Sequence, residues 1–249
     1  MKTFIHPHFE YLRDYLCLLP QRFDAEGETI YQSRNTIKVL TAPDGTRLNV
    51  KRYRIPRFPN NFVYSLGLRK PKGLRAYIYP ERLVAAGIDT PTPVAYLEER
   101  RCGLLGYSYF VSVQCEDMCT LYEVGTMTSG YELLAEELGT FTAYLHEQQV
   151  LHLDYTPGNI LWRQEDLGNF HFVLVDINRM RFGPVSQRSG CRNICRFWGP
   201  RHFTELLAKH YALSRGFDVE ETVYLTLRYR HRFWKRYARK HTIPFVMEE

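Results

Sequence analysis

The segment from His152 to Asn159, with the sequence HLDYTPGN, constrains the fold of this chain more than any other stretch. It carries a carboxylate, Asp154, and an amide, Asn159, five residues apart on one loop. The pattern predicts a helix over residues 129–147 before the loop and a short apolar strand over 160–162 after it. The chain therefore needs a helix–loop–strand unit that presents both side chains from one turn.

A second acidic residue follows the same unit. The apolar segment Phe172-Val-Leu-Val leads to Asp176, seventeen positions after Asn159, and predicts a strand over 170–175. Phosphoryl-transfer enzymes use an Asp on such a loop to orient the acceptor hydroxyl, and a loop Asn and a later Asp to hold magnesium. We therefore expect Asp154 to be the catalytic base, and Asn159 and Asp176 to bind Mg²⁺. The alternative for Asp176 is a turn acid at a strand end, and His152 is expected only to orient the loop by hydrogen bonding.

A lysine in the first half of the chain completes the set. Strands are predicted over residues 36–41 and 46–54, joined by Ala-Pro-Asp-Gly, which favours a hairpin. Alternation along the second strand places Asn49, Lys51 and Tyr53 on one face. We expect Lys51 to grip the phosphates of ATP, because it occupies the place of the phosphate-binding lysine in the order of elements. A lone strand lysine is otherwise usually solvent-facing.

Other residues are expected near the nucleotide. No G-x-G-x-x-G precedes Lys51, so a turn of Ser33, Arg34 and Asn35 would have to cover the phosphates. We also expect Val113 and Gln114, at the end of a strand predicted over 108–114, to contact ATP.

The order of the predicted elements indicates the fold class. A helix near 8–18 and the two hairpin strands are followed by a helix over 74–86, ended by Gly87, and by strands over 94–99 and 108–114. The second half is mainly helical. We predict an α+β, protein-kinase-like bilobal fold with a β-rich N-lobe (residues 1–114) that grips ATP and a helical C-lobe (115–249) that holds the catalytic loop and metal site.

Two helix starts follow from capping signals. Ser129 and Glu132 form a capping box for the helix that ends near residue 147, and Asp218 and Glu221 form one for a last long helix. Pro200 suits a first helical position. Four apolar residues recur every fourth position in the last helix and are expected to face the core: Leu225, Tyr229, Phe233 and Tyr237.

Charge and cysteine content bear on partners and compartment. Residues 51–75 hold eight cations and residues 228–241 hold seven, with no acid in either segment. Such segments attract polyanions, although each can also be a solvated face. Six cysteines in a chain without an export signal favour reduced thiols, with a four-thiolate zinc site from the two Cys-x3-Cys pairs as the alternative. The N-terminus has no apolar signal core and no segment is long enough to span a membrane, so a cytoplasmic location is expected.

Several motifs resemble the Kdo/WaaP-type lipopolysaccharide kinase family over most of residues 28–240. The motifs are Tyr31-Gln-Ser-Arg34-Asn35-Thr-Ile-Lys38, Val50-Lys51, Ala86-Gly-Ile-Asp-Thr-Pro91, Tyr109-Phe-Val-Ser112, His152-x-Asp154 with Gly158-Asn159-Ile-Leu, and Val175-Asp176-Ile-Asn178-Arg179-Met180. The resemblance implies transfer of the γ-phosphoryl group of ATP to a sugar hydroxyl, on Kdo or heptose, in the lipopolysaccharide inner core. It also implies a lipopolysaccharide or Kdo-lipid A precursor as substrate and a peripheral location on the cytoplasmic face of the inner membrane.

The chain departs from the general protein-kinase pattern at several positions. Ile177 and Asn178 replace Phe-Gly after the metal-binding Asp, no A-P-E follows, and Thr156 stands where kinases that act on proteins tend to have lysine. Members of the family tend to place the glutamate that pairs with the lysine where this chain has Ile78. Glu81 lies on the same helix face and is the expected partner of Lys51, with an exposed surface glutamate as the alternative.

Two other functions stay open. One is a kinase for a soluble small molecule such as a sugar or an aminoglycoside-like amine, and the other is a non-catalytic pseudokinase scaffold. We expect the aromatic and basic residues of 51–75, among them Phe58, Phe62, Tyr64 and Leu66, to lie against an anionic membrane. Single-stranded nucleic acid is the less favoured partner for the same segment.

Overall fold

The computed structural model describes residues 1–165, 169–243 and 245, which divide into two compact units. Unit 1 comprises Met1–Ala85, Thr90–Glu116 and Asp176–Asn178, and unit 2 comprises Ala86–Asp89, Asp117–Val175 and Arg179–Glu249. Each unit is described by itself. The separate roles expected of residues 1–114 and 115–249 stay a prediction.

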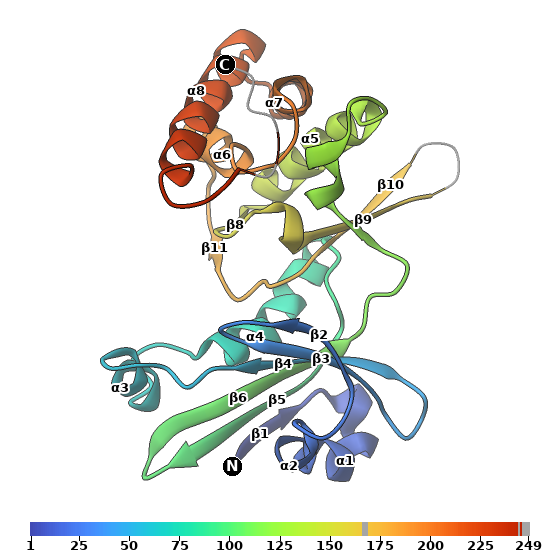
Figure 1. Cartoon of the computed structure of the whole chain (residues 1–249), viewed down its shortest axis with the longest axis vertical. Coiled ribbons are helices and arrows are strands. Elements are labelled where there is room, and N and C mark those ends of the chain that lie inside the picture. The colour runs from blue at the N-terminus through green and yellow to red at the C-terminus, as the bar shows by residue number, and fades with distance from the viewer. Residues whose placement is uncertain (166–168, 244, 246–249) are drawn as a thin grey trace. The chain divides into compact units, whose positions relative to one another are not determined.

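The described part of unit 1 is built on a six-stranded antiparallel sheet (Figure 1). The strands, in sheet order, are β1 (Lys2–Ile5), β5 (Pro93–Arg101), β6 (Leu104–Val113), β4 (Arg47–Tyr53), β3 (Thr36–Thr41) and β2 (Glu28–Gln32). The hairpin between β3 and β4 is confirmed, and Gly45 adopts the positive φ of 87° that the turn requires. Strands β1 and β2 were not predicted. Both are edge strands: β1 has only four residues and none of its side chains is buried, and all five side chains of β2 are exposed.

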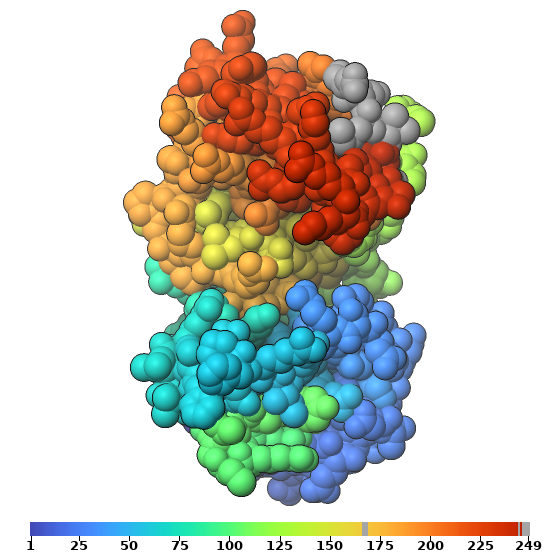
Figure 2. All heavy atoms as spheres, turned by 60° about the vertical axis from the view of Figure 1, so that its left-hand side comes forward, coloured from blue at the N-terminus to red at the C-terminus, as the bar shows by residue number. Residues whose placement is uncertain are grey.

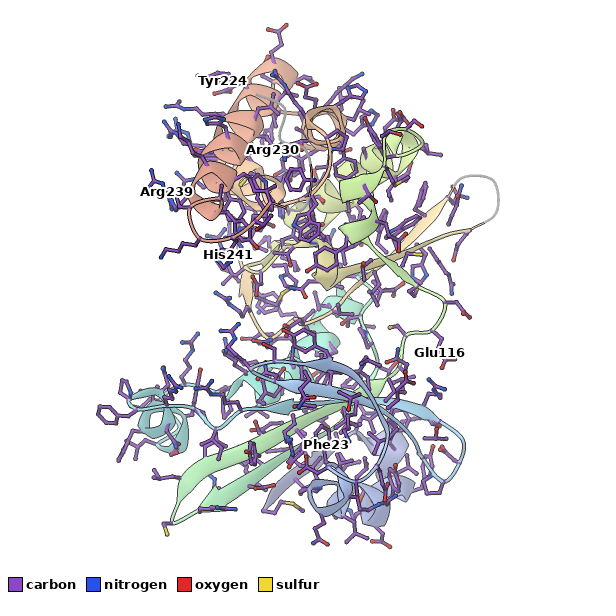
Figure 3. All side chains as sticks on the ribbon, viewed as in Figure 1. Phe23, Glu116, Tyr224, Arg230, Arg239 and His241 are labelled. Carbon is purple, nitrogen blue, oxygen red and sulfur yellow. The ribbon has the colours of Figure 1, made fainter. Side chains whose placement is uncertain are left out.

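One face of this sheet packs against the N-terminal helical segment. The segment consists of the 3₁₀ helix η1 (Pro7–Leu12) and two short helices, α1 (Arg13–Cys17) and α2 (Leu19–Arg22). The apolar residues Phe9, Leu12, Leu16 and Leu19 of this segment are buried. The single helix predicted over 8–18 is wrong, since Phe9 departs from helical geometry and Leu12, with φ −91° and ψ 9°, ends the first turn. Phe23, labelled in Figure 3, belongs to the same core.

Two helices complete unit 1: α3 (Asn60–Ser65) and α4 (Lys72–Ala85). Gly73 lets α4 approach the sheet closely, because a Cβ atom there would lie 2.7 Å from the Tyr96 ring. The predicted end of α4 is confirmed, and Gly87, just after it, has a φ of 67°.

Unit 2 is mainly helical in its described residues. Its helices are η2 (Leu121–Thr126), α5 (Glu132–Glu147), η3 (Pro157–Asn159), α6 (Gln187–Ile194), α7 (Arg201–Arg215) and α8 (Val219–Tyr237). One small sheet has the strand order β10 (Phe170–Leu174), β9 (Ile160–Gln164), β7 (Cys119–Thr120). A second consists of β11 (Met180–Phe182) and β8 (Val150–His152). Helix α5 packs on α7 at Gly139, where a Cβ atom would lie 2.5 Å from the Leu207 carbonyl oxygen. This packing supports β8 and the loop that follows it.

Two sequence expectations for these helices are wrong. Tyr131, not Ser129, is the N-cap of α5, and no side chain caps the helix there. Pro200 is the N-cap of α7 and lies one residue before its first turn. The Asp218 cap is confirmed, since its Oδ1 accepts a hydrogen bond of 2.7 Å from the Glu221 backbone N–H.

The buried face of α8 is also shifted by one residue from the predicted one. The fully buried side chains are Thr222, Thr226, Arg230 and Trp234, whereas the predicted stripe is half-buried. Arg230 tolerates burial because its guanidinium donates a 2.6 Å hydrogen bond to the Gly199 carbonyl. Three of the four buried residues of α8 are polar or charged, so the spacing of apolar residues in the sequence does not identify its buried face.

Two further features concern the state of the cysteines and the character of the helices. All six cysteines are free. Among the described residues, none of the helices combines the length and the apolar character that crossing a bilayer requires.

Candidate active site

Lys51 and Asp176 form an ion pair in unit 1. Strand β4 presents Lys51 on the sheet face away from the buried Val50, and its Nζ lies 2.7 Å from Asp176 Oδ1. Only 12% of the lysine side chain is exposed, and its Nζ also lies 5.4 Å from the centre of the Tyr53 ring. The structure thus brings together two of the residues singled out from the sequence.

The backbone at Asp176 is unusual. Its φ of 52° lies in the left-handed region, which costs a non-glycine residue roughly 1–3 kcal/mol unless its surroundings hold it there. The buried Asn178 provides such a hold, because its side-chain amide donates to the Asp176 carboxylate. Asp and Asn tolerate this region better than other side chains do.

A buried arginine lies on the helix that was expected to supply a glutamate. Arg75 of α4 is 8% exposed, and its Nε has no hydrogen-bond partner among the described residues. Burial, together with the negative charge of Asp176, raises the pKa of Tyr53 well above its ordinary value, and the positive charge of Arg75 opposes this. Glu81 is exposed, so the ion-pair partner of Lys51 in the structure is Asp176. The role of Glu81 toward ATP stays a prediction.

The other residues expected near the nucleotide also lie in unit 1. Gln114 accepts a 2.8 Å hydrogen bond from the Asn49 side chain and donates one of 2.8 Å to the Cys115 carbonyl. Asn49 stands two residues before Lys51 on the same strand face, so Gln114 extends that polar face. Asn35 accepts a 3.3 Å hydrogen bond from the Arg54 backbone, beside the turn that links β2 to β3.

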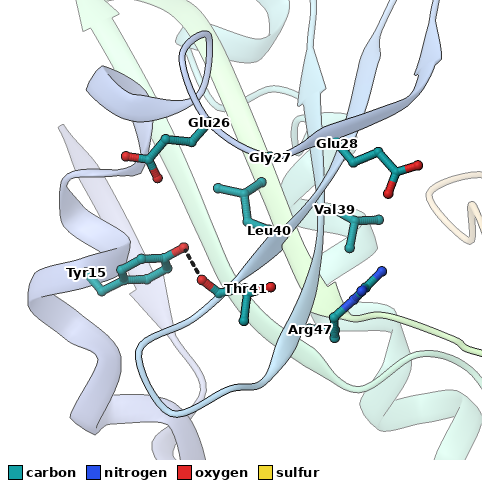
Figure 4. A pocket seen from close by; sticks show the side chains of 8 residues that line it. All are labelled: Tyr15, Glu26, Gly27, Glu28, Val39, Leu40, Thr41 and Arg47. Carbon is teal, nitrogen blue, oxygen red and sulfur yellow. Dashed lines mark hydrogen bonds between the residues drawn. The ribbon is translucent and has the colours of Figure 1, made fainter.

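A pocket of about 370 Å³ opens elsewhere in unit 1 (Figure 4). Tyr15, Gly27, Val39, Leu40 and other residues of α1, β2, β3 and β4 line it, and none of them is a residue expected to bind ATP. The Tyr15 hydroxyl closes one side by donating to the Thr41 carbonyl at 3.2 Å. Glu26, Glu28 and Arg47 also line the pocket.

The catalytic loop lies in unit 2, between β8 and β9. The Asn159 side-chain amide donates a 2.8 Å hydrogen bond to the Asp154 carbonyl, which commits its nitrogen and leaves Oδ1 as the acceptor end. Arg179 Nη1 lies 3.3 Å from Asp154 Oδ2. The loop thus orients one carboxylate, through Arg179, and one amide, through the hydrogen bond that its nitrogen makes.

His152 holds the loop, and its expected hydrogen-bonding role is confirmed. Its Nδ1 accepts the Asp154 backbone N–H at 3.1 Å, so Nε2 carries the proton and donates to the Val175 carbonyl at 3.1 Å. The Val175 N–H in turn donates to the Asn159 carbonyl at 3.0 Å. The strand that leads to Asp176 is therefore tied to the catalytic loop at its last residue.

Further hydrogen bonds connect the loop to the helices of unit 2. Asn193 of α6 donates to the His152 carbonyl at 3.0 Å, and its Oδ1 lies 3.3 Å from Nε2 of His146 on α5. Nδ1 of His146 lies 3.0 Å from the Tyr211 hydroxyl of α7. Burial lowers the pKa of His146 to about 4, so this histidine is neutral near neutral pH.

Each of Lys51, Asn159 and Asp176 carries a group of a kind that a magnesium nucleotide uses. Asp176 offers a carboxylate and Asn159 offers its amide oxygen, the hard oxygen ligands that Mg²⁺ prefers. Lys51 offers a cation suited to phosphate.

Comparison with known proteins decides the family. The sequence pattern of the lipopolysaccharide kinase (Kdo/WaaP) family matches residues 44–197, more than half of the chain. The chain belongs to the lipopolysaccharide kinase (Kdo/WaaP) family. The matched region contains Lys51, Asp154, Asn159 and Asp176, and the resemblance read from the sequence is confirmed.

Solved structures agree on the fold. WaaP in complex with acyl carrier protein is similar with a TM-score of 0.61 and 16% identity, covering 96% of this chain and 99% of that one. The amicoumacin kinase hAmiN, in complex with AMP-PNP, Ca²⁺ and Ami, gives a TM-score of 0.59 and 11% identity, covering 98% and 91%. The Rio2 kinase from Chaetomium thermophilum in an ADP/Mg²⁺-phosphoaspartate complex gives 0.51 and 13%, covering 93% and 71%. No curated protein sequence matches significantly.

These findings confirm the α+β, protein-kinase-like fold and the membership in a kinase family. The sequence interpretation missed Arg75, Arg179 and Asn193, which contact or surround the expected site residues. Arg179 carried a signal, since it stands in the Asp-Ile-Asn-Arg-Met string, whereas Arg75 and Asn193 follow only from the way their helices pack.

Proposed function

We propose that this protein is an ATP-dependent phosphotransferase that phosphorylates a sugar hydroxyl of Kdo or heptose in the lipopolysaccharide inner core. The observation that carries the proposal is the catalytic loop, in which Asp154 and Asn159 are fixed by one shared hydrogen bond. The Lys51–Asp176 ion pair and the family membership support it. All residues that the chemistry needs are present in the chain.

In the proposed reaction Asp154 orients the sugar hydroxyl and accepts its proton. A bond forms between the hydroxyl oxygen and the γ-phosphorus of ATP while the bond from that phosphorus to the bridging oxygen breaks, and ADP leaves. Asn159 and Asp176 hold Mg²⁺, which when bound neutralises charge on the phosphates. His152 keeps the loop in place through its two ring nitrogens.

Lys51 is proposed to have two successive partners. It pairs with Asp176 in the structure. When Asp176 binds the metal, the lysine becomes available to the phosphates, where its charge steadies the group that is transferred. Arg179 keeps Asp154 in its orientation from outside the reacting atoms.

The charge around Asp154 bears on the class of acceptor. A soluble small molecule is the alternative, supported by the structural similarity to amicoumacin kinase. The site of unit 2 is basic near Asp154, because Arg179 and Arg196 both contact the loop. Cations at this position suit an anionic acceptor better than a cationic amine.

We further propose that residues 57–70 contact an anionic membrane and that the protein acts on the cytoplasmic face of the inner membrane. Four large apolar side chains in this segment are exposed: Phe58 by 80%, Phe62 by 49%, Leu66 by 70% and Leu68 by 76%. Exposed cations at 57, 69 and 70 flank them, an arrangement that suits a headgroup boundary. The wider expectation for 51–75 needs correction: Tyr64 is buried, Lys51 and Arg52 are ion-paired, and Arg75 is buried.

The test of the function is magnesium-dependent transfer of phosphate from labelled ATP to Kdo-bearing lipid A, with wild-type protein and Asp154→Asn. Transfer by the wild type that the variant lacks is the expected result. Binding of Mg·ATP without transfer would move the acceptor to another class, such as a soluble sugar. Absence of nucleotide binding would contradict a catalytic function and favour a scaffold.

A further inference from the structure

A basic surface extends across unit 2 beyond the catalytic loop; at its border Glu221, in the first turn of α8, accepts a 3.3 Å hydrogen bond from Gln187 of α6. Residues 177–204, which include α6, contain six arginines and no acid, and residues 222–243, which include most of α8, contain seven Lys or Arg and no acid. Helices α6 and α8 pack on each other. Figure 2 shows their orange and red atoms side by side on one face of unit 2.

Most of these cations have no ion-pair partner within the described residues. Arg201 at the start of α7 pairs with Glu205. Eight other cations have no acidic group of the described residues within ion-pair distance: Arg188, Arg192, Arg228, Arg232, Lys235, Arg236, Arg239 and Lys240. All of these side chains are exposed. Figure 3 shows Arg239 pointing away from the helices. Such an uncompensated concentration of charge favours binding of an anion.

Two arginines on this surface are held in place by aromatic rings of α8. The Arg192 guanidinium lies 4.9 Å from the centre of the Tyr229 ring, and that of Arg196 lies 5.8 Å from the Phe233 ring. Ring contacts of this kind restrict a guanidinium while its N–H groups stay available to a ligand. Tyr229 and Phe233, which are half-buried on α8, therefore also position the side chains of Arg192 and Arg196.

The surface reaches the catalytic loop itself. Arg196 Nη1 donates a 3.0 Å hydrogen bond to the carbonyl of Leu153, the residue before Asp154. Arg192 lies one helical turn before Arg196. Arg232 lies three residues after Tyr229 on α8, and so on the same side of that helix as the ring that Arg192 contacts. A polyanion bound along these arginines would thus lie close to the acceptor hydroxyl.

We propose that Arg192, Arg196 and Arg232 form a subsite for a phosphate group that the acceptor already carries before it is phosphorylated. The inference rests on the proposed function, since it concerns an acceptor that is a phosphorylated saccharide lipid. Guanidinium groups match phosphate better than lysine does, because they donate two parallel hydrogen bonds. All six Lys or Arg residues of the segment 177–204 are arginines, which suits a phosphomonoester.

The experiment measures equilibrium binding of Kdo-bearing lipid A in neutral detergent micelles, without ATP, so that no transfer takes place. The same lipid after phosphatase treatment is the comparison. We expect the wild type to bind the phosphorylated form about 10- to 100-fold more tightly. The exposed Arg192→Gln and Arg232→Gln substitutions, combined in one protein, are expected to remove most of this preference.

Lys209→Gln, which removes an exposed cation of α7 in the same unit, is the matched control and should keep the preference. An unchanged melting temperature of the double variant establishes that its fold is intact. Equal affinity of the wild type for both forms, or an unchanged preference in the double variant, would overturn the subsite. Binding of phosphatidylglycerol vesicles that the double variant loses while it keeps the lipid A preference would assign the surface to the bilayer instead.

The outcome is independent of the transfer assay. Selective binding without phosphate transfer would preserve the subsite and reject the proposed reaction. Transfer at equal rates to both forms, with equal binding, would preserve the reaction and reject the subsite.

Discussion

The Nζ of Lys51 lies 2.7 Å from Asp176 Oδ1, with 12% of the lysine and 30% of the aspartate side chain exposed. Exposed ion pairs contribute about 0.2–1 kcal/mol, and breaking a fully buried pair costs about 3–5 kcal/mol. For this partly buried pair we expect a coupling free energy of about 1–2 kcal/mol, between those limits.

Urea unfolding of the wild type, Lys51→Met, Asp176→Asn and the double variant, without nucleotide or magnesium, measures this coupling. Effects of the two substitutions that add within about 0.5 kcal/mol would show that the pair contributes nothing. Arg52→Met, which breaks the neighbouring pair with Asp24, is a control for loss of a β4 cation.

A second prediction concerns Asp154 and Arg179. Asp154→Asn keeps the size of the side chain but removes the base, and we expect phosphate transfer to slow by about 10²- to 10⁴-fold. Nucleotide binding should change little, because the hydrogen bond from Asn159 goes to the Asp154 backbone carbonyl, which the substitution retains. Titration with a fluorescent ATP analogue checks this binding.

Arg179→Gln should have a smaller effect on transfer than Asp154→Asn. The two groups lie 3.3 Å apart, but the arginine is 53% and the aspartate 37% exposed, so water screens their interaction. We expect a decrease of less than about tenfold in the transfer rate. A loss as large as that of Asp154→Asn would show that Arg179 acts on the reacting groups directly.

A third prediction concerns the exposed apolar residues of 57–70. Phe58→Ser combined with Leu68→Ser should reduce co-sedimentation with anionic vesicles by about tenfold or more, since each buried side chain contributes about 1.5–3 kcal/mol. Leu213→Ser removes an apolar side chain of α7 that is 57% exposed and is the matched control. Binding that ignores both the substitutions and the anionic lipid content would contradict membrane contact through this segment.

A fourth prediction is a pH dependence of stability from His146. Burial lowers its pKa from 6.5 to about 4; the hydrogen bond that His146 Nε2 makes to Asn193 Oδ1 opposes this shift, and the charges of Arg215 and Arg181 add to it. The unfolded chain therefore binds a proton that the folded protein excludes, and the free energy of unfolding falls as pH decreases from 6.5 toward 4. Between about pH 7 and pH 5 the decrease amounts to roughly 2 kcal/mol.

Urea unfolding at both pH values, for the wild type and His146→Gln, checks this. Other titrating groups are common to both proteins, so the difference between their pH slopes belongs to His146. Identical slopes would show that the histidine is protonated in the folded state as readily as in the unfolded chain.

The sequence was most informative where function restricts several residues at once. The loop with Asp154 and Asn159 has a fixed spacing, and the strand before Asp176 is continuously apolar, so both could be located without a structure. Strands β3 to β6 followed from alternation and turn residues. Edge strand β2 did not, because its side chains are all exposed and its pairing depends on β3.

The errors have a common physical cause. The buried face of α8 contains Thr222, Thr226 and Arg230, whose polar atoms are acceptable only where a partner such as the Gly199 carbonyl exists. The ion-pair partner of Lys51 likewise depends on which side chain reaches it in three dimensions, and that proved to be Asp176 while Glu81 is exposed. Neither relationship can be read from residue spacing.

The left-handed backbone of Asp176 restricts which residues can replace it. Glutamate would retain a carboxylate for the proposed metal site, but a longer side chain with a strong preference for negative φ would have to deform the turn that Asn178 stabilises. Asparagine and glycine tolerate the left-handed backbone conformation, but neither has a negatively charged side chain. Position 176 is thus restricted by two independent requirements, and aspartate is the residue that meets both.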